Sequence, residues 1–188
     1  MNIALLASGK GSNVKNILSF FKENNDGNKI CLIATNNPNS PVRDYALGYQ
    51  TPSVLFTKQD LNKEGYLIDL MESYQIDLVV LAGFLLMIPF DFIKHFKGKI
   101  INIHPSLLPK YGGKGMYGDH VHRAVLKNNE STSGITFHYV NENYDEGQII
   151  SQFEVSLSQE ETLASLKHKI DVLEKKHYPL VISSILNE

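Results

Sequence analysis

The segment at residues 102–109, with the sequence NIHPSLLP, contains an amide and an imidazole two residues apart. On an extended chain this spacing places the side chains of Asn102 and His104 on the same side. An imidazole, with an unperturbed pKa of about 6.5, is suited to proton transfer near neutral pH, and an amide can donate a hydrogen bond to developing negative charge. A single histidine after a strand is more often structural, so the pair supports both a catalytic and a structural interpretation.

A carboxylate at Asp145 is a second candidate for chemistry. It lies in the segment NYDEG, residues 143–147, and an aspartate close to a glycine in a loop usually serves the turn itself. A functional role requires a partner, because a carboxylate near His104 would favour the imidazolium ion and hold it in place. Sequence spacing alone does not establish that contact.

A glycine-rich segment near the N-terminus is the third candidate. The segment Gly9-Lys10-Gly11-Ser12-Asn13 follows an apolar run and precedes residues at helical spacing, so its N–H groups are predicted to form an anion site. Val14 replaces the third glycine of the dinucleotide pattern, and no acidic residue follows the second strand at residues 35–37, so NAD is disfavoured. The segment also fails to match a Walker A loop, and a turn without a ligand remains the alternative.

The elements that position these residues alternate along the first half of the chain. Apolar runs predict strands, and residues at spacings of three and four predict helices. This alternation favours an α/β fold, Rossmann-like and doubly wound, with a mostly parallel sheet. The predicted strands are residues 2–7, 29–35, 53–56, 76–81 and 99–103, and the predicted helices are 14–21, 42–47 and 61–74.

The second half has a different pattern. A helix is predicted at 119–127, followed by strands at 131–140 and 148–155 with no long helix between them, so antiparallel strands should be added to the sheet. Ser158 and Glu161 form a predicted capping box for a C-terminal helix, in which Pro179 should cause a kink or a restart. We expect one domain over residues 1–188, with a phosphate-binding half at about 1–100 and a catalytic half at about 101–188.

Composition excludes several classes of protein. The 188 residues include 18 basic and 20 acidic side chains, a net charge of −2, which disfavours nucleic-acid binding. Cys31 is the single cysteine, so the sequence predicts no internal disulfide and no cysteine-rich metal site, and the cytoplasm is the expected location. The longest apolar run, residues 78–90, is interrupted by Gly83 and Pro89 and is too short for a membrane span.

The other histidines are weaker candidates for a functional role. His120 and His122 form an H-x-H pair without an acidic or cysteine cluster beside it, so we interpret both as surface residues rather than metal ligands. His138, in a predicted strand, fits either the core or the lining of a site.

Four segments together resemble the phosphoribosylglycinamide formyltransferases, a folate-dependent family. They are SGKGSN at 8–13, LAGF at 81–84, NIHPSLLPKY at 102–111 and YDEGQII at 144–150, and the resemblance runs to about Ile182. It implies transfer of a formyl group from 10-formyltetrahydrofolate to the amine of 5-phosphoribosylglycinamide, with small-molecule substrates and no metal, nucleic acid or membrane. A monomer or homodimer is expected.

The resemblance also implies roles for individual residues. Asn102, His104 and Asp145 match the family's catalytic triad, and Glu174 matches the carboxylate that binds the substrate's ribose. Gly11, Ser12 and Asn13 match the positions that hold the substrate phosphate. The folate pocket is expected at Leu85, Leu86, Met87 and Ile88, at Asn102, and at Asn141, Glu142, Asn143, Tyr144 and Asp145, with Lys63 near the folate tail. Leu86 stands where better-known members carry arginine, and residues 112–118 are unusually rich in glycine.

Three alternatives remain beside this one. Methionyl-tRNA formyltransferase shares the SLLP region but carries an extra domain for tRNA, and formyltetrahydrofolate hydrolase carries an extra N-terminal regulatory domain, so chain length disfavours both. A catalytically silent nucleotide-binding module would keep the glycine-rich segment without needing Asn102, His104 and Asp145 together.

Overall fold

The computed structural model describes residues 1–24 and 27–187 and divides the chain into two compact units. The first comprises Met1–Ile101 together with the residues from Ile182 onward, and the second comprises Asn102–Val181. The boundary lies close to the one expected between the phosphate-binding and catalytic halves. That the two units act as one domain stays a prediction.

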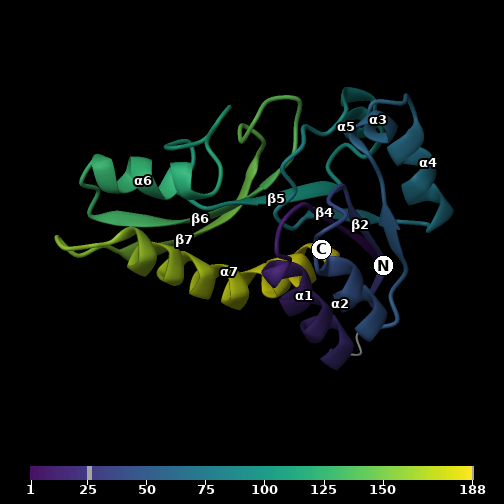
Figure 1. The fold of residues 1–188 in the computed structure, drawn as a ribbon, viewed down its shortest axis with the longest axis horizontal. Coiled ribbons are helices and arrows are strands. Elements are labelled where there is room, and N and C mark those ends of the chain that lie inside the picture. The colour runs from purple at the N-terminus through teal and green to yellow at the C-terminus, as the bar shows by residue number, and fades with distance from the viewer. Residues whose placement is uncertain (25–26, 188) are drawn as a thin grey trace. The chain divides into compact units, whose positions relative to one another are not determined.

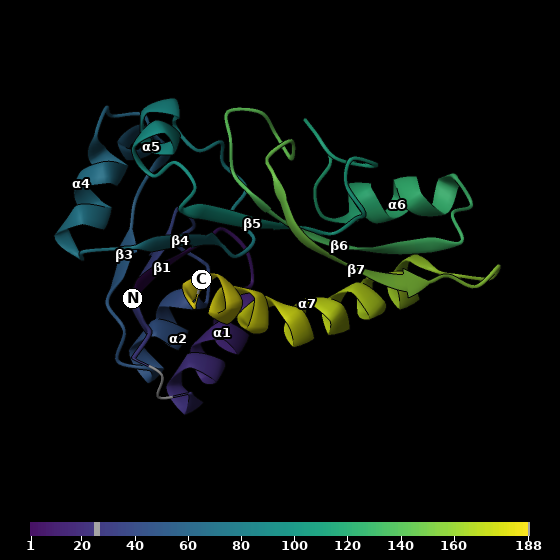
Figure 2. The ribbon, with the colours of Figure 1, turned by 180° about the vertical axis from the view of Figure 1, so that it is seen from behind.

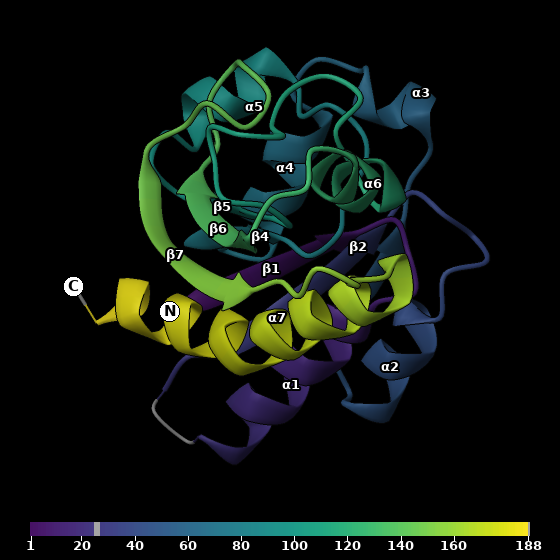
Figure 3. The same cartoon turned by 90° about the vertical axis from the view of Figure 1, so that its left-hand side faces the viewer.

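The first unit is built on parallel strands in the order β3-β2-β1-β4. Residues 3–7 of β1 are fully buried, because helices cover both faces of these strands (Figure 3). The first helix buries Val14, Ile17, Leu18 and Phe21, the residues whose spacing predicted it. The strands are β1 (Asn2–Ala7), β2 (Lys29–Thr35), β3 (Ser53–Leu55) and β4 (Leu78–Leu81), and the helices are α1 (Ser12–Glu23), α2 (Val42–Gly48), α3 (Lys58–Leu61), α4 (Tyr66–Ser73) and α5 (Phe90–His95).

The single helix predicted at 61–74 is wrong, since two helices occupy this region. A capping box between Thr57 and Asp60 starts α3 early, and α3 ends at Leu61. Gly65 then adopts a left-handed conformation with φ 76° and precedes α4, while its N–H donates to Asp91 at 3.0 Å. Glycine adopts this conformation without the cost that a Cβ imposes, which explains the break. Helix α5 was not predicted.

The second unit contains most of β5 (Ile100–His104), then α6 (Asp119–Lys127), β6 (Thr132–Tyr139), β7 (Ile149–Ser156) and most of α7 (Leu163–Leu186). Strands β6 and β7 pair antiparallel, as predicted. Within this unit, α6 and α7 lie on opposite faces of the β6–β7 pair (Figures 1 and 2). On the α7 face, the ring of Phe137 contacts that of Tyr178, with centroids 5.2 Å apart.

The start of α7 differs from the prediction. The helix begins at Leu163, and its cap is the hydroxyl of Thr162, which accepts from the N–H of Ser165 at 3.1 Å. Ser158 and Glu161 do interact, through the Ser158 N–H and the Glu161 carboxylate at 3.0 Å, but in the turn before the helix. The helix continues through Pro179 without restarting.

Hydrogen-bonded neighbours give the strand order β3-β2-β1-β4-β5-β6-β7, a mixed sheet that is mostly parallel with an antiparallel C-terminal pair. The predicted fold class is therefore confirmed. Across the described part of the chain, no helix has the length and apolar character needed to cross a membrane.

Candidate active site

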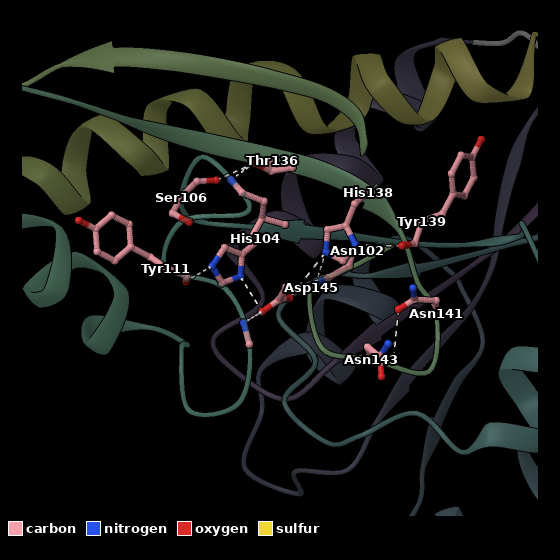
Figure 4. Close-up of polar contacts among 12 residues, drawn as sticks. Asn102, His104, Ser106, Tyr111, Thr136, His138, Tyr139, Asn141, Asn143 and Asp145 are labelled. Carbon is pink, nitrogen blue, oxygen red and sulfur yellow. Dashed lines mark hydrogen bonds and ion pairs between the residues drawn. The ribbon is translucent and has the colours of Figure 1, made fainter. Parts of the chain in front are cut away.

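Strand β5 carries Asn102 and His104 into a cluster within the second unit (Figure 4). His104 is 3% exposed, and its Nδ1 lies 3.4 Å from Oδ2 of Asp145. The contact that sequence spacing could not establish between these two residues is therefore present. A buried imidazole beside a carboxylate is the arrangement expected of a group that holds or moves a proton.

Asp145 reaches His104 from the loop between β6 and β7. Its backbone is left-handed, with φ 58°, and its Oδ2 also accepts the N–H of Gly113 at 2.9 Å. Burial alone would raise the pKa of Asp145, but the His104 contact, the His104 charge and the Gly113 hydrogen bond outweigh it and lower the pKa overall. Gly112 permits this approach, because a Cβ there would stand 2.6 Å from Leu108 and 3.2 Å from Cβ of Asp145. Asp145 is therefore held as a carboxylate.

His138 completes the cluster from β6, which resolves the choice between core and site lining. Its Nδ1 lies 2.9 Å from the carbonyl oxygen of Tyr139, so Nδ1 carries the proton and Nε2 accepts from the amide of Asn102 at 3.2 Å. Burial lowers the pKa of His138 and keeps the ring neutral. Nε2 of His138 is also 3.7 Å from Oδ1 of Asp145. His138 thus orients the Asn102 amide, and the amide retains a second N–H for a ligand.

The second nitrogen of His104 has a backbone partner. Nε2 lies 2.7 Å from the carbonyl oxygen of Tyr111 (Figure 4). Two acceptors, a carbonyl and a carboxylate, therefore face the two ring nitrogens, and only the imidazolium ion can donate to both. The roles of Tyr111 and Gly113 have no signal in the sequence, because both residues act through backbone groups.

A buried hydrogen-bond network fixes the turn that follows β5. Thr136 donates to the carbonyl of Ser106 at 2.7 Å and accepts from the N–H of Leu108 at 3.0 Å. Gln152 donates to both Thr136 and the Leu108 carbonyl, each at 2.9 Å. The SLLP segment is thereby tied to β6 and β7, and the position of His104 does not depend on a free loop.

The glycine-rich segment lies in the first unit, at the carboxyl end of β1. Gly11 is left-handed, with φ 70°, and as the N-cap residue of α1 it makes no side-chain cap hydrogen bond. A Cβ on Gly11 would overlap Cγ1 of Val42, so the tight turn requires glycine. The first turn of α1 contains no acidic residue, and in it Ser12 is exposed and Asn13 is 8% exposed. The start of α1 therefore has the features of an anion site.

The predicted folate segment at 85–88 lies beside the glycine-rich segment within the same unit. Ser8 joins the two, because its N–H donates to the Gly83 carbonyl at 3.1 Å and its hydroxyl accepts from the Leu85 N–H at 3.0 Å. Leu85 and Met87 are 60% and 55% exposed, whereas Ile88 is 6% exposed and Leu86 is half-buried. Two large apolar side chains are thus open to a ligand.

Three other predicted regions lie apart from this segment in the chain. Lys63 is exposed and its ammonium pairs with Asp60 at 2.7 Å, in the connection between α3 and α4. In the loop at 141–145, the Asn143 N–H donates to Oδ1 of Asn141 at 3.0 Å, and Glu142 and Tyr144 are exposed. Glu174 is half-buried on α7, one turn before Tyr178, whose pKa is raised by burial and by the Glu174 charge.

The interpretation of His122 as a surface residue is wrong. His120 is exposed, but His122 is 6% exposed on the apolar face of α6, next to the buried Val121. Its Nδ1 has no hydrogen-bond partner within residues 1–24 and 27–187, and burial lowers the pKa of the ring. Helical spacing separates His120 from His122 by about 200°, so one faces water while the other is buried. Among the described residues, no group of three His, Cys, Asp or Glu side chains could hold a metal ion.

Comparisons with known proteins show which proteins the chain resembles. The chain is 36% identical over 99% of its length to the chloroplastic phosphoribosylglycinamide formyltransferase of Arabidopsis thaliana, of which it spans 65%. It spans 61% of a relative of the same name from Vigna unguiculata, and 93% of the 35% identical phosphoribosylglycinamide formyltransferase of Bacillus subtilis.

Solved structures of phosphoribosylglycinamide formyltransferases are also similar to this chain. The crystal structure of the phosphoribosylglycinamide formyltransferase from Bacillus halodurans superposes with a TM-score of 0.89 at 32% identity, covering 100% of this chain and 96% of that one. The sequence model of the formyl transferase family matches residues 1–182, which include every residue of the cluster around His104. The chain therefore belongs to the formyl transferase family.

Proposed function

We propose that this chain transfers the formyl group of 10-formyltetrahydrofolate to the amine of 5-phosphoribosylglycinamide, which yields the N-formyl product and tetrahydrofolate. The observation that carries the proposal is the buried His104, with Asp145 facing Nδ1 and the Asn102 amide oriented by His138. Relatives that bear this enzyme's name, and the family to which the chain belongs, support the choice of substrates.

In the proposed reaction, the substrate amine attacks the formyl carbon and negative charge develops on the formyl oxygen. The second N–H of Asn102 and the His104 imidazolium would donate to that oxygen, and one such preorganised donor contributes about 10²–10³ in rate. The amine must lose a proton, and the folate nitrogen must gain one before it leaves. The Asp145 carboxylate faces Nδ1 of His104 at 3.4 Å and orients the ring, and His104 or an ordered water carries the proton.

The resemblance assigns binding roles to several segments of the chain. The start of α1 at Gly11, Ser12 and Asn13 would hold the substrate phosphate, and Glu174 would hold the ribose hydroxyls. Residues 85–88 and 141–145 would receive the folate, with Lys63 near its glutamate tail. The left-handed turn at Gly11 before α1 and the exposed Leu85 and Met87 support these assignments. We keep the cytoplasm as the proposed location.

The test mixes purified protein with 10-formyl-5,8-dideazafolate, with and without 5-phosphoribosylglycinamide, and follows the absorbance change of deformylation. We expect a signal that requires the amine substrate, and mass spectrometry should identify the formylated product. An equal signal without the amine would identify a hydrolase. If neither mixture gives a signal but phosphate ligands still bind, the alternative of a catalytically silent nucleotide-binding module would be favoured.

A further inference from the structure

We propose that Tyr111 is a positioning residue for His104. Its backbone carbonyl accepts a hydrogen bond from Nε2 of His104, which leaves Nδ1 of His104 to interact with the substrate. The phenol of Tyr111 is fixed by Glu130 and Asn128, and we call these three residues the Tyr111 anchor. The assignment of Nδ1 to the formyl group rests on the proposed function. The effect of the anchor on the His104 ring does not.

The contact between Tyr111 and His104 commits one ring nitrogen to the protein. A backbone carbonyl only accepts, so at 2.7 Å it requires a proton on Nε2. Nδ1 lies 3.4 Å from Asp145, which is longer than an ordinary hydrogen bond, so its proton is less tightly held. The ring thus has one nitrogen bound to the backbone and one that a substrate atom can share with Asp145.

The backbone of Tyr111 is left-handed, with φ 60°. A residue with a Cβ is disfavoured in this region, and a strained backbone persists only where surrounding contacts determine it. Glycine at this position would relieve the strain but would supply no side chain to hold the turn. The preceding carbonyl, of Lys110, is already held by the hydroxyl of Ser106 at 2.7 Å.

Contacts around the phenol supply the restraint that this backbone needs. The Tyr111 hydroxyl donates to Oε1 of Glu130 at 2.8 Å and accepts from the Asn128 amide at 2.9 Å. Burial raises the pKa of Tyr111, and the phenol hydrogen bond lowers the pKa of Glu130, so the phenol stays a donor and Glu130 stays charged. Asn128 ends α6 and Glu130 lies two residues before β6, so the anchor ties the Tyr111 turn to regular structure.

Glu130 has one further partner, which supplies a matched control. Lys110 pairs with the same carboxylate at 3.0 Å, but its side chain is 67% exposed. The substitution Lys110→Met removes this ion pair and keeps both phenol hydrogen bonds. Glu130→Gln also removes the ion pair but keeps an acceptor for the phenol, whereas Glu130→Ala removes the acceptor.

The kinetic test compares Tyr111→Phe, Glu130→Ala, Glu130→Gln and Lys110→Met in the complete chain. Loosening the carbonyl should misplace His104, so we expect kcat to fall about tenfold for Tyr111→Phe and Glu130→Ala, with both KM values within about twofold. Glu130→Gln and Lys110→Met should keep kcat within about twofold of the unsubstituted protein. A purely structural role would lower the melting temperature without this split between kcat and KM.

The second readout is the tautomer of His104, measured by long-range ¹H–¹⁵N NMR at about pH 9, where imidazoles are neutral. The His104 signals are assigned by their absence in His104→Asn. We expect the proton on Nε2 in the unsubstituted protein, Glu130→Gln and Lys110→Met, and a shift toward Nδ1 in the other two variants.

An unchanged tautomer and unchanged kcat in Tyr111→Phe would overturn the proposal. Should that variant fail to fold, Glu130→Ala carries the same comparison. Absence of formyl transfer in the unsubstituted protein would refute the proposed function alone, because the NMR measurement needs no substrate and still decides whether the anchor sets the tautomer.

Discussion

The cluster of Asn102, His104, His138 and Asp145 differs from the glycine-rich segment at residues 8–13 in how it presents polar groups. In the cluster, buried side chains pair with one another, and each partner restricts where the protons lie. At the start of α1, the N-cap residue is Gly11, which makes no side-chain cap hydrogen bond and forms a tight turn because it lacks a Cβ. Proton transfer needs a donor or acceptor that is held in place in a defined starting protonation state, whereas anion binding needs accessible N–H groups. The difference predicts which substitutions affect chemistry and which affect binding.

The largest effect should come from His104→Asn, which removes the imidazole ring and keeps a polar side chain. We expect kcat to fall about 10³-fold, since general acid–base groups contribute about 10²–10⁴. Binding of the phosphate-containing substrate should change little, because the glycine-rich segment is untouched. Steady-state kinetics and calorimetric titration with 5-phosphoribosylglycinamide measure both quantities. A matching loss of substrate affinity would show that the cluster and the segment are not separate in function.

The next effect should come from Gly11→Ala, with Gly9→Ala as its matched control. A Cβ on Gly11 would overlap Val42, and alanine at φ 70° costs about 1–2 kcal/mol by itself. We expect the free energy of unfolding to fall by about 2 kcal/mol, and KM for the phosphate-containing substrate to rise about tenfold with a smaller change in kcat.

A methyl group on Gly9 would meet no atom of the described residues within 4 Å, so Gly9→Ala should change stability little. The expected change in the free energy of unfolding is within about 0.5 kcal/mol. Urea denaturation of both variants gives the stability difference, and the kinetic assay gives KM. Equal effects of the two substitutions would contradict the inference that the turn at Gly11 shapes the anion site.

Sequence reasoning succeeded where the side chain itself carries the signal. Residues 29–35 form a strand with the predicted bounds, because an apolar run lies between turn-forming segments. Asn102, His104 and Asp145 were singled out by residue type and by the resemblance, and the structure brings them together. The period of two along a strand could also have placed His138 on the same face as Thr136.

The parts that were not predicted depend on tertiary contacts or on the backbone. Gly65 within a helical pattern fits either a tolerated glycine or a break, and its hydrogen-bond partner Asp91 lies 26 residues away in the chain. The Tyr111 carbonyl and the Gly113 N–H have no signature in the sequence, since nearly every residue has these groups. The burial of His122 required the orientation of α6, which the H-x-H spacing alone does not give.

A smaller effect should distinguish His122 from His120, which lie on the same helix with different burial. Burial lowers the pKa of His122 below that of the unfolded chain, so its contribution to stability is present above about pH 6.5 and is lost as the pH falls toward the lowered value. Lys167, Asp119 and His104 are the charged groups that also act on this ring.

We therefore expect His122→Gln to make the decline of stability between about pH 7 and pH 5 shallower, and His120→Gln, at an exposed position of the same helix, is the comparison variant. Thermal unfolding across this pH range measures the slope. A steeper decline in His122→Gln would mean that the ring is protonated in the folded state, contrary to the effect of burial.

The smallest effect should come from Lys63→Met. This substitution removes the exposed ion pair between Lys63 and Asp60, in contrast to the buried pair of His104 and Asp145. The ammonium of Lys63 is exposed, and its hydrogen bond to Asp60 raises the pKa of Lys63. An exposed pair contributes little to stability, and a lysine that already pairs with Asp60 gains less from a second carboxylate. We expect KM for a monoglutamate folate to change by less than about twofold and kcat to stay constant.

A polyglutamate donor tests whether Lys63 contacts the glutamate tail of the folate. A rise in KM confined to that donor would place the folate tail at Lys63, and an unchanged KM would exclude Lys63 from the site.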